Sequence, residues 1–140
     1  MSSTIYYNAI SYTINHVNLS LGSKCPQTTI IHTKNTHKVI YLLYKLGCIN
    51  NFVLHSKVKG RRLQKYVTFS IFFFKNTPFF KSLRLVSSPS KKHTVTYSGL
   101  RIIQQSLGAS VLLISSVHGL ITHEKALKLK IGGLIVAVLN

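Results

Sequence analysis

Two short segments in the second half of the chain combine residue types that suit contact with a polyanion. The first is a hydroxyl-rich stretch in which Ser115, Ser116, His118 and Gly119 carry the chemistry. Short serine hydroxyls at a tight turn can donate to a phosphate, a ribose hydroxyl or a base edge. Gly119 allows close approach to the backbone. The alternative is an ordinary polar turn between two strands.

The second segment covers residues 87–92. It joins the hydroxyls of Ser87 and Ser88 to Pro89, which fixes φ, and to the cations Lys91 and Lys92. These donors suit phosphate contact in the same way, and the alternative is a solvated loop.

The densest group of cations surrounds Gly60, at a predicted hairpin turn. It consists of Lys57, Lys59, Arg61, Arg62 and Lys65. A run of charge is usually a solvated face, but here no acidic residues offset it. Phosphate contact is therefore favoured.

The number of acidic residues excludes more kinds of chemistry than the length of the chain does. The chain has 140 residues, 18 Lys and Arg, and a single acid, Glu124, so its formal net charge is +17. One carboxylate cannot supply a glycosidase pair, a two-metal site or a carboxylate-ligated calcium site. Nine of the cations lie in residues 1–70 and nine in residues 71–140. We therefore expect a body that is cationic throughout and has a polyanionic partner.

Other chemistries have little support. A triad of Ser115, His118 and Glu124 lacks a G-x-S-x-G elbow, and Glu124 suits the N-terminus of a helix better. A zinc site lacks any closely spaced ligand pair among its candidates, which are Cys25, Cys48, His16, His32, His37 and His55. The phenylalanine clusters at residues 72–74 and 79–80 favour a core or protein interface over base stacking. We predict no enzymatic activity, no cofactor, no metal, and two reduced structural thiols.

The elements that must position these residues follow from periodicity and turn signals. In the first half, the patterns predict a helix with a cap at Ser2 or Ser3, a short strand, a helix capped within residues 33–36, and a hairpin. The ranges are 5–19, 28–32, 36–46, 49–57 and 63–75, with a loop over 21–27. Asn76-Thr77-Pro78 predicts a domain boundary, which gives domains 1–76 and 77–140.

In the second half of the chain, the same patterns predict short strands that alternate with two short helices. The strands cover residues 83–86, 110–114, 120–121 and 134–139, and the helices cover 97–107, capped by Ser98, and 122–130, capped by Thr122. No stretch is long and apolar enough for a membrane span, and the N-terminus has no signal-peptide pattern.

Residues 108–138 resemble the end of small-subunit ribosomal protein S-eight. Ser115, Ser116 and Gly119 match the family's S-T-S-x-G turn, Thr122 matches its helix start, and Gly132-Gly133 matches its double glycine. Residues 84–89 resemble its R-V-S-x-P stretch, with Leu85 intervening, and residues 36–53 resemble its second helix and the strand after it. The sequence departs from the family pattern at Val117, His118, Leu134 and Ser90.

The resemblance implies an α/β (α+β) protein of two small domains, an N-terminal αβαββ domain and a C-terminal, mostly antiparallel β domain with short helices. It implies a structural protein that binds the central domain of small-subunit rRNA and supports subunit assembly and translation. Its partners would be that rRNA and neighbouring small-subunit proteins, with no small-molecule substrate and no membrane insertion. The expected RNA-binding residues are Ser115, Ser116, His118, Gly119, Ser87, Ser88, Pro89, Lys91, Lys92, Arg84, Lys57, Lys59, Arg61 and Arg62.

Composition adds an expectation about location. Lys, Asn, Ile, Tyr and Phe are abundant while Asp and Trp are absent, which is typical of an AT-rich genome. Together with the departures from the family pattern, this favours a mitochondrial member, in the matrix on the small mitoribosomal subunit, over a plastid or bacterial one. A basic protein that associates with membrane surfaces is the alternative from another functional class.

Overall fold

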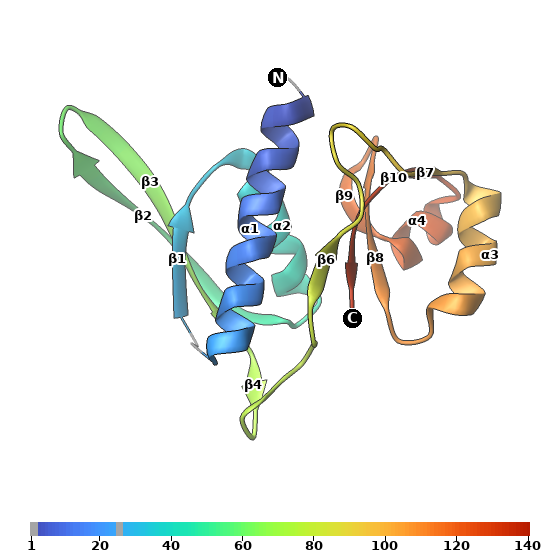
Figure 1. Ribbon diagram of the computed structural model, residues 1–140, viewed down its shortest axis with the longest axis horizontal. Helices are drawn as coiled ribbons and strands as arrows, with labels where there is room; N and C mark the ends of the chain where they lie inside the picture. Colours follow the sequence, from blue (N-terminus) through green and yellow to red (C-terminus); the bar gives the residue numbers. More distant parts are fainter. Residues whose placement is uncertain (1–2, 25–26) are drawn as a thin grey trace. The chain divides into compact units, whose positions relative to one another are not determined.

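The chain folds into two compact units, each with antiparallel strands and helices (Figure 1). The computed structural model describes residues 3–24 and 27–140. The units are Met1–Lys81 and Ser82–Asn140, so the division falls after Lys81, whereas the sequence placed it after Asn76. The predicted mixed α and β class is confirmed. Within the described ranges, no helix has the length and apolar character that a membrane crossing requires.

The N-terminal unit has the predicted αβαββ order, followed by two very short strands. Its elements are α1 (Ser3–Ser23), β1 (Gln27–Ile31), α2 (Lys34–Lys45), β2 (Ile49–Lys59), β3 (Arg62–Ile71), β4 (Phe73–Phe74) and β5 (Thr77–Pro78). The sheet order is β1-β3-β2, and α1 and α2 pack against each other and against the sheet. Buried side chains of the helices and sheet form the core, including Ile14, Val17, Ile30, Val39, Leu43, Val67 and Phe69.

Helix α1 is longer than predicted and reaches into the expected loop over residues 21–27. Leu21 is buried, which favours continuing the helix. The hydroxyls of Ser20 and Ser23 donate to the carbonyl oxygens of His16 and Leu19, one turn earlier, and so do not break the helix. The predicted cap at Ser2, the thiol of Cys25 and the loop residue Pro26 lie outside the described residues.

Helix α2 lies within two residues of its predicted range, 36–46, and its cap lies in the predicted segment 33–36. Thr33 is the N-cap, and it forms a capping box with Thr36, in which each hydroxyl accepts from the other residue's backbone N–H. Gly47 follows the helix with φ +82°, a conformation that favours glycine. This cap geometry places α2 against β2.

The C-terminal unit is a four-stranded antiparallel sheet with one additional short strand. Its elements are β6 (Leu83–Leu85), β7 (Thr94–Val95), α3 (Tyr97–Leu107), β8 (Val111–Ser116), β9 (Gly119–Thr122), α4 (His123–Leu129) and β10 (Gly133–Leu139). The order is β6-β10-β8-β9, and β7 pairs with the start of β10. A buried cluster holds α3 and α4 to the sheet: Leu100, Leu112, Ile114, Ile121 and Ala126.

Two local predictions for this unit were wrong. Helix α3 is capped by Thr96, whose hydroxyl accepts from the Gly99 backbone N–H at 3.2 Å, and not by Ser98, which is exposed. Strand β8 continues through Ser116, because Ser115 and Ser116 pair with Leu120 and Gly119 of β9. The turn between the strands is therefore only two residues long. Thr122 caps α4, as predicted.

Candidate nucleic-acid interface

The β8–β9 turn is closed by the hydroxyl of Ser116. This hydroxyl donates to the Gly119 carbonyl oxygen at 3.2 Å and accepts from the His118 backbone N–H at 3.2 Å. Gly119 has φ +91°, a conformation that favours glycine. The turn presents Val117, 91% exposed, and His118, also exposed, at its tip. Ser116 therefore shapes the turn, and its hydroxyl is already used within it.

Ser115 is the serine of this segment that keeps a free hydroxyl. Its side chain is half-buried, and within the described residues its hydroxyl has no hydrogen-bond partner. The backbone beside it is tightly packed against β10. A Cβ at Gly133 would collide with the Ser115 carbonyl oxygen and would lie 2.8 Å from the Ile114 side chain. Gly133 thus allows β10 to pass close under the turn, and this contact fixes the position of Ser115.

The segment at residues 87–92 is attached to β10 by a buried hydroxyl. Ser87 is fully buried, its hydroxyl donates to the Ile135 carbonyl oxygen, and it accepts from the His93 backbone N–H at 3.1 Å. The Val86 N–H donates to the Val136 carbonyl oxygen, at an irregularity in the pairing of β8 with β10. The sequence predicted a contact residue at Ser87. The hydroxyl is buried and has two protein partners, which favours a role in positioning the loop over contact with a ligand.

The rest of this loop is compact and exposed. Ser88 and Lys91 exchange backbone hydrogen bonds of 2.9 and 3.2 Å, and the Ser88 hydroxyl accepts from the Lys91 N–H at 3.1 Å. This arrangement leaves Pro89, Ser90, Lys91 and Lys92 exposed. The loop therefore offers two cations and a hydroxyl from a backbone that is fixed at both ends.

The two hydroxyl-rich segments meet at the beginning of β10, although 22 positions separate residue 92 from residue 115. Leu134 pairs with Ser115 of β8 on one side. Ile135, the next residue, bonds on the other side to the Ser87 hydroxyl and, through its N–H, to the His93 carbonyl oxygen at 2.8 Å. The sheet thus brings both predicted segments to one end of the C-terminal unit. We name this end, made of residues 87–92 and 115–119, the hydroxyl edge.

Arg84 lies further along the same sheet. It is exposed on β6 and pairs with Val138, near the other end of β10. It is therefore not part of the hydroxyl edge.

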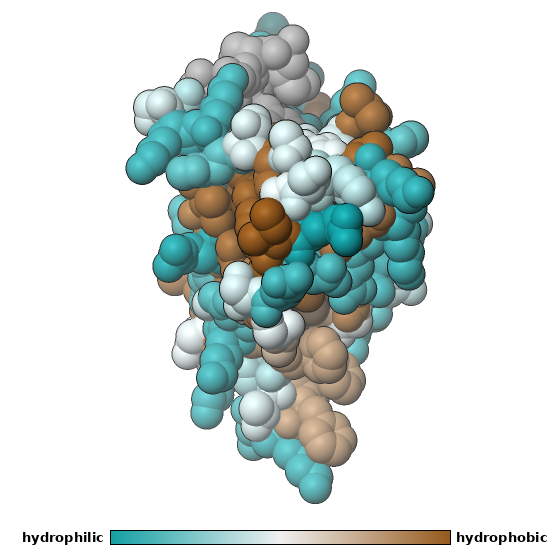
Figure 2. Space-filling model, turned by 90° about the vertical axis from the view of Figure 1, so that its right-hand side faces the viewer, coloured by the Kyte–Doolittle hydropathy of each residue, from teal (hydrophilic) through white to brown (hydrophobic). Residues whose placement is uncertain are grey.

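Figure 2 shows a face on which hydrophilic side chains surround a hydrophobic patch. The exposed large hydrophobic residues of the C-terminal unit are Ile102, Val117 and Leu129.

The remaining predicted cations lie in the N-terminal unit, on a ribbon formed by the outer part of β2 and β3. Cross-strand partners share a face in such a ribbon. The pairs Lys57–Gln64 and Lys59–Arg62 share one face with His55–Tyr66, whose rings stack with centroids 5.9 Å apart. The pairs Val58–Leu63 and Ser56–Lys65 share the other face. Arg61 is exposed at the two-residue turn. The ribbon is thus basic on one face and mixed apolar and basic on the other.

The sequence also raised two other kinds of site, a metal site and a Ser–His–Glu triad. In the described part of the chain, no group of three His, Cys, Asp or Glu side chains comes together as a metal would require. His118 is exposed at the β8–β9 turn, and Glu124 is exposed in the first turn of α4. Cys48 is a buried, free thiol, and burial raises its pKa to about 11, so it is a structural thiol as predicted.

Sequence reasoning missed His123, a buried histidine in α4. Its Nδ1 accepts from the Leu112 backbone N–H at 3.1 Å, which links α4 to β8. Burial lowers the pKa of His123, and the neighbouring Glu124 partly opposes that effect. The only sequence signal was its place directly after a helix cap, which does not distinguish a buried ring from an exposed one.

Known proteins match most of the chain. The family model for ribosomal protein S8 matches residues 8–139. Small ribosomal subunit protein uS8m of Acanthamoeba castellanii is 24% identical over 124 residues, 89% of this chain and 92% of that protein. Small ribosomal subunit protein uS8c of Euglena gracilis is 28% identical over 131 residues, 90% of this chain and 92% of that protein. Small ribosomal subunit protein uS8 of Mesomycoplasma hyopneumoniae strain 7448 is 29% identical over 106 residues, 76% of each chain.

Proposed function

Because the chain belongs to the ribosomal protein S8 family, we propose that it is a structural constituent of the small ribosomal subunit that binds small-subunit rRNA directly. The family is structural and not catalytic, which confirms the prediction that this chain is not an enzyme. Binding to the central domain of the rRNA, and support of subunit assembly and translation, belong to the same proposal. Neighbouring small-subunit proteins would be its other partners.

The observation that carries the proposal is the convergence of two hydroxyl-rich segments at the beginning of β10. Lys91 and Lys92 are exposed there, and the chain's one acid is on α4. Exposed cations attract a polyanion from a distance, and short hydroxyls on a fixed backbone then select its shape. Double-stranded RNA offers 2′-hydroxyls and base edges in a wide, shallow minor groove, which such turns fit.

From the geometry we assign the predicted residues three roles. Ser115, His118, Gly119, Ser88, Pro89, Lys91 and Lys92 are accessible or half-buried at the hydroxyl edge, and we assign direct RNA contact to them. Ser87 and Ser116 hold the loop and the turn through their hydroxyls. Lys57, Lys59, Arg61 and Arg62 are exposed cations of the N-terminal unit, and Arg84 is exposed further along the C-terminal sheet. We assign phosphate contacts to these five residues.

A mitochondrial location is part of the proposal. The AT-type composition and the mitochondrial relative from Acanthamoeba support it, while chloroplast and bacterial relatives match at similar identity. Fractionation of the source cells tests this location. We expect the chain in the matrix, co-sedimenting with the small mitoribosomal subunit, and recovery with plastid or cytosolic ribosomes would contradict it.

The test of RNA binding compares two polyanions. The purified full chain is titrated with a folded fragment of the small-subunit rRNA central domain and, separately, with anionic phospholipid vesicles of equal charge concentration. We expect tighter binding to the RNA, and retention of that preference at about 0.15 M salt, where screening has weakened unspecific attraction. A preference for vesicles would favour a membrane-surface protein and overturn the proposal.

A further inference from the structure

A hollow in the N-terminal unit gathers basic groups that no motif singled out. One part, of about 260 Å³, is lined by His32, Leu54, His55, Ser56 and Lys65. A neighbouring part, of about 420 Å³, shares His32 and Leu54 and adds Lys34, His37 and Lys38. Because two lining residues are common to both, we treat them as one basic hollow between the end of β1, the start of α2 and the β2–β3 ribbon.

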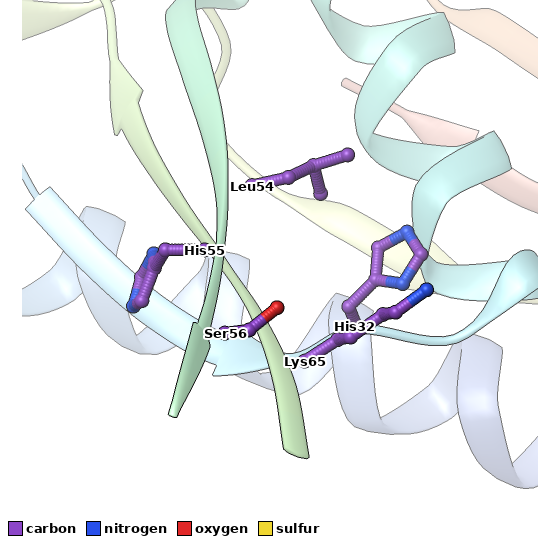
Figure 3. Close-up of a pocket in the computed structure, with 5 residues that line it drawn as sticks. All are labelled: His32, Leu54, His55, Ser56 and Lys65. Atoms are coloured by element: carbon purple, nitrogen blue, oxygen red, sulfur yellow. The ribbon is translucent and has the colours of Figure 1, made fainter. Parts of the chain in front are cut away.

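The ribbon turns its less basic face toward this hollow. Leu54 and Ser56 alternate with His55 along β2, and Ser56 is the cross-strand partner of Lys65. Figure 3 shows the side chains of Leu54 and Ser56 directed to the side on which His32 and Lys65 lie, with the His55 ring on the opposite side of the strand. The His32 backbone N–H donates to the Lys65 carbonyl oxygen at 3.0 Å, which holds these two residues together.

The imidazoles of His32 and His37 lie in a row of aromatic rings. The rings of His32 and His37 have centroids 5.5 Å apart, and His37 stacks on Tyr41 of the next helical turn and meets the edge of Phe52. The Nδ1 atom of His37 is buried and has no hydrogen-bond partner. A buried polar atom without a partner costs free energy unless a ligand satisfies it.

The N-terminal unit has no acidic side chain to balance the charge of this hollow. Lys34, Lys38 and Lys65 are exposed around it, and the only acid of the chain, Glu124, belongs to the other unit. Burial lowers the pKa of His32, and the positive charge of His37 and Lys65 lowers it further. The same field that disfavours a proton on His32 favours an anion beside it. An anion in the hollow would therefore raise the pKa of His32.

We infer that the basic hollow binds a phosphate group of an RNA strand, held by Lys34, Lys38 and Lys65 and by the imidazoles of His32 and His37. This inference rests on the proposed rRNA binding and adds to it a second contact region, in the other unit of the chain. Because the imidazoles donate two hydrogen bonds only when protonated, the contact strengthens as the pH falls through the histidine range.

The first experiment measures the affinity of the full chain for the rRNA fragment at about pH 8 and about pH 6, at constant salt. The variants are the double substitution His32→Gln with His37→Gln and, because these rings help to pack α2, the single exposed substitution Lys65→Gln. We expect each to bind several-fold more weakly than wild type at pH 6, on the scale of about fivefold for one phosphate contact at about 0.15 M salt. We also expect the double variant to lose most of the gain in affinity that wild type shows at pH 6.

His16→Gln is the matched control, since His16 lies on α1 of the same unit against Tyr12 and away from the hollow. It should keep the wild-type affinity and pH response. If wild type binds the RNA and both hollow variants match it at each pH, the hollow is not a contact and only this inference fails. If wild type itself shows no preference for RNA over vesicles, the proposed function fails as well.

A second experiment tests phosphate binding in the hollow in the absence of RNA. The proton resonances of the His32 and His37 rings are followed through a pH titration of the full chain, with and without inorganic phosphate. We expect phosphate to shift the ring resonances of His32 and His37 and to leave those of His16 unchanged. Equal shifts at all three histidines, or none at any, would overturn the assignment of the hollow as a phosphate site.

Discussion

The hydroxyl edge of the C-terminal unit and the β2–β3 ribbon of the N-terminal unit differ in the side chains that they expose and in how firmly the backbone holds those side chains. At the hydroxyl edge, the side chains are short and hydrogen bonds hold their backbone. Examples are the backbone hydrogen bonds between Ser88 and Lys91 and the hydrogen bond from the Ser116 hydroxyl to the Gly119 carbonyl oxygen. On the ribbon, the exposed groups are long Lys and Arg side chains on two strands that extend past β1. The first arrangement fixes the positions of donors, and the second provides charge without fixing where each cation lies.

This difference assigns the two regions different shares of RNA binding. Long cations contact phosphates of any sequence and shape, and their contribution falls steeply with salt. Hydroxyls on a fixed backbone contribute less charge but discriminate among shapes. We therefore expect substitutions at the hydroxyl edge to change specificity and local stability, and substitutions on the ribbon to change the salt dependence.

The largest effect is expected from Gly133→Ala, which tests whether close packing of β10 positions the hydroxyl edge. The added methyl group would collide with the Ser115 carbonyl oxygen. We expect a loss of about 1–3 kcal/mol in unfolding free energy, the usual cost of overpacking, together with weaker binding to the rRNA fragment. Chemical denaturation and RNA titration measure the two effects.

Gly22→Ala is the control for that substitution. Gly22 lies in α1, and a Cβ there would meet no atom within 4 Å. Alanine in a helix should leave the stability unchanged or raise it by up to about 1 kcal/mol. A Gly133→Ala chain as stable as the Gly22→Ala chain would remove the packing argument for the hydroxyl edge.

Ser87→Ala tests the attachment of the second segment to β10. The substitution leaves the His93 N–H and the Ile135 carbonyl oxygen without their shared partner, at a cost of about 1–3 kcal/mol. Ser90→Ala, at an exposed hydroxyl in the same loop, should change the stability by less than about 0.5 kcal/mol. Equal stabilities for the two variants would show that the buried hydroxyl does not hold the loop.

The contribution of the ribbon cations should appear in the salt dependence of RNA binding. We expect Lys57→Gln, Lys59→Gln and Arg62→Gln each to flatten the slope of log affinity against log salt by about one unit or less. Lys91→Gln and Lys92→Gln should act similarly, but they should also change the preference between different RNA fragments. A ribbon variant that alters fragment preference while the slope stays constant would reverse the proposed division between the two regions.

The smallest effect is a pH dependence in the C-terminal unit. Since burial lowers the pKa of His123 below its ordinary value of 6.5, the unfolded chain binds a proton there more readily than the folded one. The stability contribution is therefore complete above about pH 6.5 and is lost as the pH falls below it. Hydrogen-exchange protection of the Leu112 amide, which donates to His123, measures this locally.

His123→Asn is the matched variant for that measurement, because the Asn side-chain oxygen can accept from Leu112 and does not titrate. We expect its Leu112 protection to vary less with pH than that of wild type. The same pH dependence in both chains would mean that His123 is not the titrating group.

The sequence predicted most of the fold because local signals agreed with the tertiary structure. The amphipathic pattern, the Thr33 cap and Gly47 together define α2 within one or two residues. Predictions failed where two candidates competed locally. Thr96 and Ser98 both offer a capping hydroxyl, and only the three-dimensional position of the Gly99 N–H selects Thr96. Similarly, nothing local shows that Leu21 is buried and continues α1.

The residues of the candidate site stay a prediction, and the structure adds which of their hydroxyls have partners within the protein. Composition and the turn pattern pointed to Ser87, Ser115 and Ser116, but long-range contacts decide which hydroxyls are free. Ser87 is used by β10, 48 positions away in the chain, and Ser116 by its own turn. The basic hollow was not predicted, because β1, α2 and the ribbon contribute its residues from distant positions with no motif of their own.

The most direct test of the central claim is the affinity of the full chain for the central-domain rRNA fragment, measured for wild type, Ser115→Ala and Ser106→Ala. Ser115 keeps its hydroxyl free at the hydroxyl edge, whereas the exposed Ser106 hydroxyl, on α3, bonds within its own helix. We predict that Ser115→Ala weakens binding by about 1 kcal/mol, or roughly fivefold, and that Ser106→Ala binds as wild type does. Equal affinities for all three chains would contradict direct RNA contact at the hydroxyl edge.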